Sequence, residues 1–249
     1  MNTLARGCVA EFLGTFALCF FGIGSIVITQ DSVGAGSLVT VALAHGMALV
    51  IFVTGCMYVS GAQFNPAVSL GLFSIGKQGI GQTMAFIATQ LVAAACATGI
   101  IVATLGRGMT DPVHVGATVG SLTEAGGTGE ILALEAIMTF ALMFVILSAV
   151  VDERAHKLGG FMVGLTVVTC IVGFGPLTGA SMNPSRSFGP AMYAWDSYNG
   201  LFWVYVVAPI AGALAAAWVY KLVWEKGGVE APESPAVPLH EGDPTRKHA

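Results

Sequence analysis

Long apolar stretches separated by short polar segments dominate the chain between residues 8 and 222. Six of these stretches are about 20 residues long, the length at which an α-helix crosses the hydrocarbon core of a bilayer. They predict membrane-spanning helices over residues 8–28, 38–58, 82–104, 131–151, 160–177 and 200–222. Two further apolar segments, 65–75 and 183–193, are about ten residues long, so each covers about half of that core. The pattern predicts six spanning helices and two helices that enter the membrane without crossing it.

Composition agrees that lipid surrounds most of the chain. Of the 249 residues, 55% are hydrophobic and 10% are charged, whereas soluble domains carry about 25% charged residues. The ten Lys and Arg residues form no basic face, so no nucleic-acid partner is expected. The five cysteines lie in apolar runs without metal-site or disulfide spacing, and no metal or cofactor is expected. Residues 227–249 are rich in Pro, Glu and Gly and are predicted to form a disordered tail.

The distribution of basic residues predicts the orientation. With six spans, both termini lie on the same side of the membrane. That side collects Arg6, Lys77, Arg154, Lys157, Lys221 and Lys226. The other side has only Arg107 and Arg186. The positive-inside rule therefore predicts cytoplasmic termini, including a cytoplasmic tail, and we expect a multi-pass protein of the cell (plasma) membrane.

The chain also contains an internal repeat. The hexapeptide from Glu11 recurs 124 residues later from Glu135, and the segment Ser60 to Ser69 recurs 118 residues later from Thr178. The repeats, about 6–110 and 130–222, each hold three spans and one short helix. Because three is an odd number, the second repeat must lie inverted in the membrane. Inverted repeats with interrupted helices place a substrate path near the bilayer midplane.

Both short helices begin with an Asn-Pro motif: Asn65-Pro66-Ala67 in the first repeat and Asn183-Pro184-Ser185 in the second. Asn is a preferred N-cap, and Pro is favoured at the first helical position. Two inverted half-helices that start at the midplane bring their N-termini together, so their dipoles create a positive potential that repels cations. We expect the two Asn side chains to offer N–H groups to a passing oxygen. These features predict a channel for small neutral molecules.

With these motifs, with Glu11 and Glu135, and with the run from Arg186 to Pro190, residues 6 to about 222 resemble the aquaporins and glycerol facilitators. The resemblance implies an all-α membrane protein: an aquaporin-like bundle of six transmembrane helices and two re-entrant half-helices. We expect a single channel domain over residues 1–226, one pore per subunit and a homotetramer in the lipid bilayer. The loop after Val151 resembles archaeal members. Ser185 stands where Ala is usual in the family, and we expect its hydroxyl to perturb half-helix packing only slightly.

The resemblance also implies a constriction, or selectivity filter, of four residues. Matched by distance from the Asn residues, they are His45, Ile171, Ala180 and Arg186, a set that resembles the tonoplast branch. Ile and Ala predict a wider opening with one apolar wall. His45 is expected to offer a donor or acceptor there, with a charge that responds to pH.

Two further positions near the constriction bear on selectivity. Ser187, directly after Arg186, is typical of water channels, whereas glycerol facilitators resemble one another in having Asp at this position. His114 resembles a tonoplast histidine that approaches the filter Arg, and a solvated loop histidine is the alternative.

The acids Glu11 and Glu135 lie inside spans, where carboxylates are costly and usually paired. They are either structural acceptors for backbone N–H groups before the half-helices, as the resemblance implies, or the coupling site of an ion-driven transporter. No nucleophile–base pair indicates an enzyme. We expect a passive water channel that excludes protons and ions and also passes ammonia, hydrogen peroxide or glycerol. The alternatives are a glycerol or small-solute facilitator and an ion-coupled secondary transporter.

Overall fold

A computed structural model describes residues 3–30, 35–152 and 158–225, and these residues form helices and no strands. Six helices of this described part are long and apolar enough to cross a membrane. They are α1 (Thr3–Ile28), α2 (Ala35–Ser60), α4 (Ile80–Leu105), α7 (Thr128–Ile146), α8 (Gly159–Thr178) and α10 (Val204–Val219), and the spans of α7 and α10 include the helical turns that follow them, to Val151 and Trp224. The six predicted spans are confirmed, with ends that differ by a few residues.

The largest differences lie at helix ends. The helix predicted from residue 200 begins at Val204, because Gly200 takes a φ of 76° and the chain turns before the helix starts. Helices α7 and α10 continue as π-helical turns, η2 (Leu147–Val151) and η4 (Tyr220–Glu225). The connections on the far side from the termini hold short helices that the apolar pattern did not predict. These are α5 (Arg107–Thr110), η1 (Asp111–Gly116), α6 (Ser121–Glu124) and η3 (Trp195–Tyr198).

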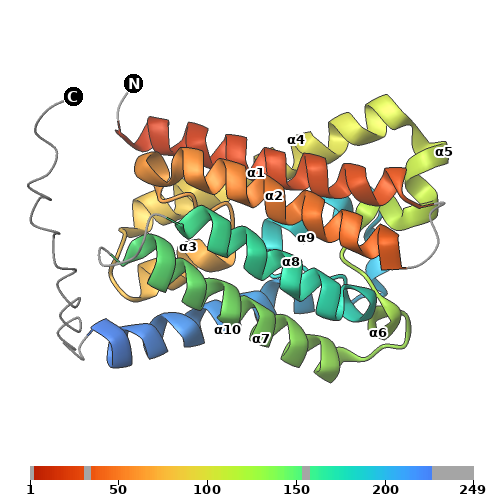
Figure 1. The fold of residues 1–249 in the computed structure, drawn as a ribbon. Coiled ribbons are helices and arrows are strands. Elements are labelled where there is room, and N and C mark those ends of the chain that lie inside the picture. Colours follow the sequence, from red (N-terminus) through yellow and green to blue (C-terminus); the bar gives the residue numbers. More distant parts are fainter. Residues whose placement is uncertain (1–2, 31–34, 153–157, 226–249) are drawn as a thin grey trace, which may run out of the picture.

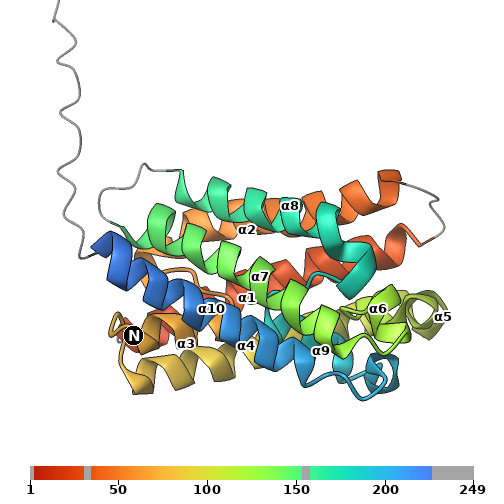
Figure 2. The ribbon, with the colours of Figure 1, turned by 90° about the horizontal axis from the view of Figure 1, so that it is seen from below.

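The two predicted half-helices are α3 (Pro66–Ser74) and α9 (Pro184–Ala191). Both Pro residues occupy the first helical position, where the missing N–H costs nothing. Figures 1 and 2 show α3 in the half of the bundle nearest the N-terminus and α9 in the opposite half, near α5 and α6. The half-helices therefore point in opposite directions from the middle of the bundle, as an inverted repeat requires.

The spanning helices lie side by side along the length of the bundle (Figure 1). Helix α7 packs on α10 within the second repeat, whereas α2 packs on α8, α3 on α10 and α4 on α9 across the two repeats. The α2–α8 pair approaches closely at Gly164, where a Cβ would collide with the carbonyl oxygen of Gly46. Small residues at such crossings let two backbones pack in lipid. This packing joins the two repeats into one bundle.

Both ends of the described chain lie at the same end of the bundle (Figures 1 and 2). There Lys221 of η4 donates a hydrogen bond to the carbonyl oxygen of Ile75, 3.1 Å away, at the end of α3. Arg154, Lys157 and Lys226, which entered the orientation argument, lie outside the described residues, as does the predicted tail 227–249.

Candidate pore and constriction

The loops that lead into the two half-helices share an unusual backbone conformation. Positive φ values recur at matching positions: 84° at Gly61 and Gly179, 50° and 43° at Ala62 and Ala180, and 50° and 53° at Phe64 and Met182. Residues with a Cβ seldom adopt such angles, and where they do the surrounding structure must hold them. The structure therefore needs specific contacts that stabilise each loop.

Glu11 of α1 supplies these contacts in the first repeat. One carboxylate oxygen accepts hydrogen bonds from the Ser60 hydroxyl at 2.6 Å and the Gln63 N–H at 2.9 Å. The other accepts from the Phe64 N–H at 2.6 Å and from the side-chain amide of Gln90 at 2.9 Å. Glu11 is fully buried, and its four donors come from three different elements.

Glu135 of α7 has the same role in the second repeat. One oxygen accepts from the Thr178 hydroxyl at 2.7 Å and the Ser181 N–H at 2.9 Å, and the other from the Met182 N–H at 2.8 Å. Buried carboxylates need such donors because an unpaired buried charge is very costly. The geometry is that of the structural acceptor expected for both acids.

Asn65 and Asn183 cap the half-helices and also join the two loops. The Asn65 side-chain oxygen accepts from the Ala67 N–H at 2.9 Å, and that of Asn183 accepts from the Ser185 N–H at 3.0 Å. Each amide nitrogen crosses to the other repeat: that of Asn65 donates to the Met182 carbonyl oxygen and that of Asn183 to the Phe64 carbonyl oxygen, both at 2.8 Å. An amide nitrogen carries two hydrogens, so one on each Asn remains for a molecule in the path.

Ser185 is accommodated without disturbing this arrangement. Its side chain is fully buried, and its hydroxyl donates to the side-chain oxygen of Asn183 at 2.8 Å. The hydroxyl thus adds a contact inside its own N-cap rather than reaching α3.

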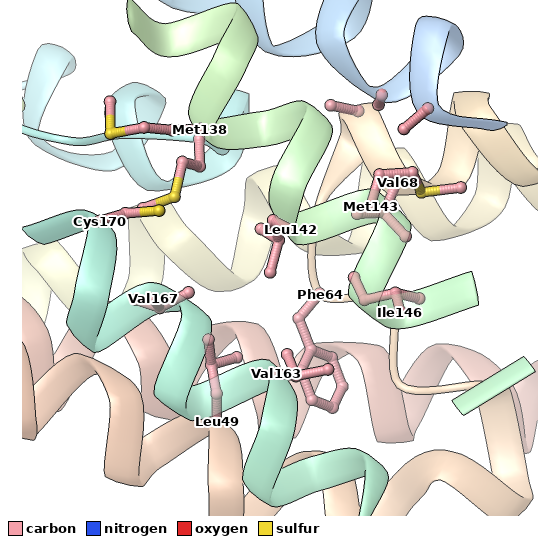
Figure 3. Close-up of a cluster of buried hydrophobic side chains, with 14 of the residues drawn as sticks. Leu49, Phe64, Val68, Met138, Leu142, Met143, Ile146, Val163, Val167 and Cys170 are labelled. Carbon is pink, nitrogen blue, oxygen red and sulfur yellow. The ribbon is translucent and has the colours of Figure 1, made fainter. Parts of the chain in front are cut away.

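A narrow cavity of about 30 Å³ passes the two Asn side chains. This space is large enough for a water molecule, which needs about 10–15 Å³. On the side of the termini its wall is aliphatic and aromatic; Figure 3 shows part of this wall, with side chains from α2, the first loop, α7 and α8, among them Leu49, Phe64, Leu142, Ile146, Val163 and Val167. The lining also contains all four residues of the predicted constriction: His45, Ile171, Ala180 and Arg186.

A second, wider cavity of about 610 Å³ shares a lining residue with the narrow one. Ile171 lines both cavities, and it therefore lies at their junction. The wider cavity is bordered by loop residues such as His114 and Ala117, so we describe it as the vestibule.

At the constriction, Arg186 and His45 bind each other. Both residues are 4% exposed, and Arg186 Nε donates to His45 Nε2 at 3.1 Å. His45 Nδ1 lies 2.8 Å from the Val41 carbonyl oxygen, which can only accept, so Nδ1 carries the ring proton and Nε2 is the acceptor. Both ring nitrogens are therefore occupied within the protein. The expectation that His45 offers a free donor or acceptor to the permeating molecule was wrong.

The other protein partner of Arg186 comes from the loop ahead of α6. Arg186 Nη1 donates to the Gly116 carbonyl oxygen at 2.9 Å. His114, predicted as a support for Arg186, instead lies with its Nδ1 2.9 Å from the Ser197 hydroxyl and borders the vestibule. The contact that supports Arg186 thus comes from the backbone carbonyl of Gly116 and not from a histidine. A pattern of residue types in the sequence does not reveal a backbone contact of this kind.

Buried hydroxyl groups hold this loop against α9. The Thr118 and Ser187 hydroxyls lie 2.5 Å apart, and the Tyr198 hydroxyl donates to the Ser187 carbonyl oxygen at 2.9 Å. Burial raises the pKa of Tyr198 above its ordinary value, so the hydroxyl keeps the proton that it donates. Ser187 thus packs behind the constriction, and its side chain is absent from the cavity lining.

A bundle of six spanning helices, with two half-helices that meet at paired Asn residues beside a narrow lumen, defines a membrane channel. The family model "Major intrinsic protein" matches residues 1–220. "Aquaporin NIP1-1" from Oryza sativa subsp. japonica is 39% identical over 216 residues, covering 86% of this chain and 73% of the relative. "Probable aquaporin AqpM" from Archaeoglobus fulgidus is 38% identical over 246 residues, covering 88% of this chain and 96% of the relative.

Among solved structures, that of the aquaglyceroporin from Plasmodium falciparum matches with a TM-score of 0.78 and 30% identity, covering 88% of this chain and 96% of that one. The chain belongs to the major intrinsic protein family, the family of the aquaporins. It is a multi-pass membrane channel for water or small solutes and not an enzyme.

Proposed function

We propose that the protein conducts water passively, excludes protons and ions, and also passes small neutral solutes such as ammonia, hydrogen peroxide or glycerol. The observation that carries this proposal is the narrow lumen past Asn65 and Asn183, which ends at the constriction around Arg186. The half-helix N-termini and the buried guanidinium both put positive charge beside the path, which repels cations and protons.

A small-solute facilitator is the second candidate, and the constriction geometry favours it over a strict water filter. Arg186 and His45 bind each other, so the imidazole offers no free polar group to a solute. The other two residues of the constriction, Ile171 and Ala180, have apolar side chains. The carbon backbone of a small polyol can pack against such a wall while its hydroxyls accept from the remaining Arg186 N–H groups. The similarity to an aquaglyceroporin agrees with this candidate.

An ion-coupled transporter is disfavoured by the surroundings of its candidate acids. Glu11 accepts four hydrogen bonds and Glu135 three, and neither lines the narrow cavity. A coupling carboxylate must exchange its ion with the path, and these two have no contact with it.

We further propose that residues 1–226 act as one channel domain in a homotetramer in the plasma membrane, with both termini cytoplasmic. In the described part, Arg6, Lys77 and Lys221 belong to segments at the end of the bundle that holds the termini, and Arg107 begins α5 at the other end. This distribution supports the orientation by the positive-inside rule.

The proposal is tested by stopped-flow light scattering on proteoliposomes, with water, glycerol and ammonia compared and proton flux followed with an internal pH dye. We expect water permeability well above that of empty liposomes and no added proton flux. Ile171→Trp should abolish conduction because the indole fills the junction of lumen and vestibule. Val172→Trp is the matched control, since Val172 is 44% exposed on the outer face of α8. Wild-type water permeability equal to that of empty liposomes would refute the water-channel proposal.

A further inference from the structure

The position of the His45 ring depends on a residue of another helix. Gly22 of α1 is buried, and a Cβ built on it would lie 2.7 Å from His45 Cε1 and closer still to Nε2 and Cδ2. The three nearest neighbours of this hypothetical carbon are therefore all atoms of the imidazole. The ring lies directly against the α1 backbone, in space that only glycine leaves open.

The same ring edge holds Arg186. The atom nearest to the hypothetical Cβ is Nε2, the nitrogen that accepts the hydrogen bond from Arg186 Nε. A methyl group at position 22 would therefore press on the acceptor itself. The Nδ1 bond to Val41 holds the opposite edge of the ring, so the ring has little freedom to slide along α2.

We propose that Gly22 is a positioning residue of the constriction: its missing side chain lets His45 lie back against α1 and hold the Arg186 guanidinium against the wall. Any larger residue moves the imidazole toward the lumen and breaks its bond to Arg186. The opening then narrows and the guanidinium loses one of its two protein partners. Gly22 thereby sets which solutes pass, without touching them. This inference rests on the proposed function, because it assigns selectivity to the same four residues.

The test is a double-mutant cycle of wild type, Gly22→Ala, His45→Ala and Gly22→Ala/His45→Ala, with water and glycerol permeability measured in proteoliposomes. Gly24→Ala is the matched control on α1, since nothing lies within 4 Å of a Cβ at that position. We expect Gly22→Ala to lower glycerol permeability by about tenfold, the lower end of the effect of one carbon in a tight pocket, and water permeability by less. In the His45→Ala background the same substitution should change neither, because the ring that it displaces is gone.

The inference would be overturned if Gly22→Ala had the same effect in the wild-type and His45→Ala backgrounds. It would also be overturned if the permeabilities of Gly22→Ala matched those of the control Gly24→Ala. If Gly22→Ala does not fold but Gly22→Ala/His45→Ala does, the collision between residue 22 and the His45 ring is supported. If neither variant folds, the inference is overturned. These outcomes are distinct from failure of the proposed function, which appears as a wild type that conducts no water.

Discussion

At the residue scale, the pair formed by Arg186 and His45 controls how the constriction presents its polar groups. The buried guanidinium donates to a histidine nitrogen and to a backbone carbonyl, and both partners belong to the wall. Two donors are thereby directed away from the lumen, and the remaining N–H groups of Arg186 are available to a solute. Arg186 therefore supplies the polar groups that face a solute in the filter, while His45 fixes the position of the guanidinium.

Replacement of His45 by Phe tests this division of roles. The variant removes the acceptor at Nε2 and puts a larger apolar ring at the constriction, so we expect the glycerol-to-water permeability ratio to fall by about tenfold or more. His114→Asn is the control: Asn tolerates the positive φ of 52° at this vestibule position, and the ratio should not change. An unchanged ratio in the His45→Phe variant would refute the assignment of His45 to the constriction.

The hydrogen bonds of His45 also predict the response to pH. A second ring proton would sit on Nε2 and face the Arg186 N–H instead of accepting from it. We therefore expect water permeability to stay constant between about pH 6 and pH 8, the range in which a free histidine titrates. Proteoliposome swelling at stepped pH measures this. A titration in that range that disappears in the His45→Phe variant would show that His45 gains a proton after all.

At the element scale, two carboxylates hold the half-helices in the middle of the bundle. Helices α3 and α9 are too short to cross the membrane, and the loops before them contain strained positive φ values. Glu11 and Glu135 bind backbone N–H groups of these loops, and the two Asn side chains tie one loop to the other. The half-helices are thus positioned by long-range hydrogen bonds more than by their own propensity.

Replacing either acid by Gln should destabilise the bundle. Each carboxylate oxygen of Glu11 and of Glu135 accepts from a backbone N–H, so a Gln amide nitrogen meets an N–H in either orientation. We expect each substitution to lower the free energy of unfolding by about 1–3 kcal/mol. Thermal unfolding in detergent, followed by tryptophan fluorescence, measures the loss. Glu124→Gln, at an exposed position of α6, is the control and should lie within about 0.5 kcal/mol of wild type. A melting temperature unchanged in Glu135→Gln would contradict the structural role.

At the scale of the whole molecule, the six spans place both ends of the described chain at one end of the bundle, and the vestibule lies near the other. The aliphatic part of the lumen occupies the half toward the termini, and the Arg186 constriction the half toward the vestibule. A permeating molecule therefore meets the charged and apolar parts of the path in sequence, with the two Asn side chains between them.

The orientation predicts which loops face the cytoplasm. A cysteine at Glu124 should react with a membrane-impermeant maleimide added to intact cells, and one at Lys77 should react only after permeabilisation. Both positions are exposed, and the unsubstituted protein measures the background from the five native cysteines. The opposite labelling pattern would show that the termini are external.

The sequence by itself determined the six spans, the two half-helices and the inverted order of the repeats. These features depend on local apolar length, on N-cap chemistry and on a motif that occurs twice. The family resemblance added His45, Ile171, Ala180 and Arg186, and the structure brings all four to the lining of one cavity. The predicted support by His114, in contrast, was replaced by the carbonyl of Gly116.

Only the tertiary structure decided how the constriction is held. Arg186 binds partners 141 and 70 residues away in the chain, and one of them is a backbone carbonyl that any residue type supplies. Gly22 acts through the absence of a side chain, and a glycine inside an apolar helix has no motif to mark it. The physical reason is that periodicity and capping depend on neighbours in sequence, whereas the orientation of a ring or a guanidinium depends on which atoms of other helices occupy the surrounding space.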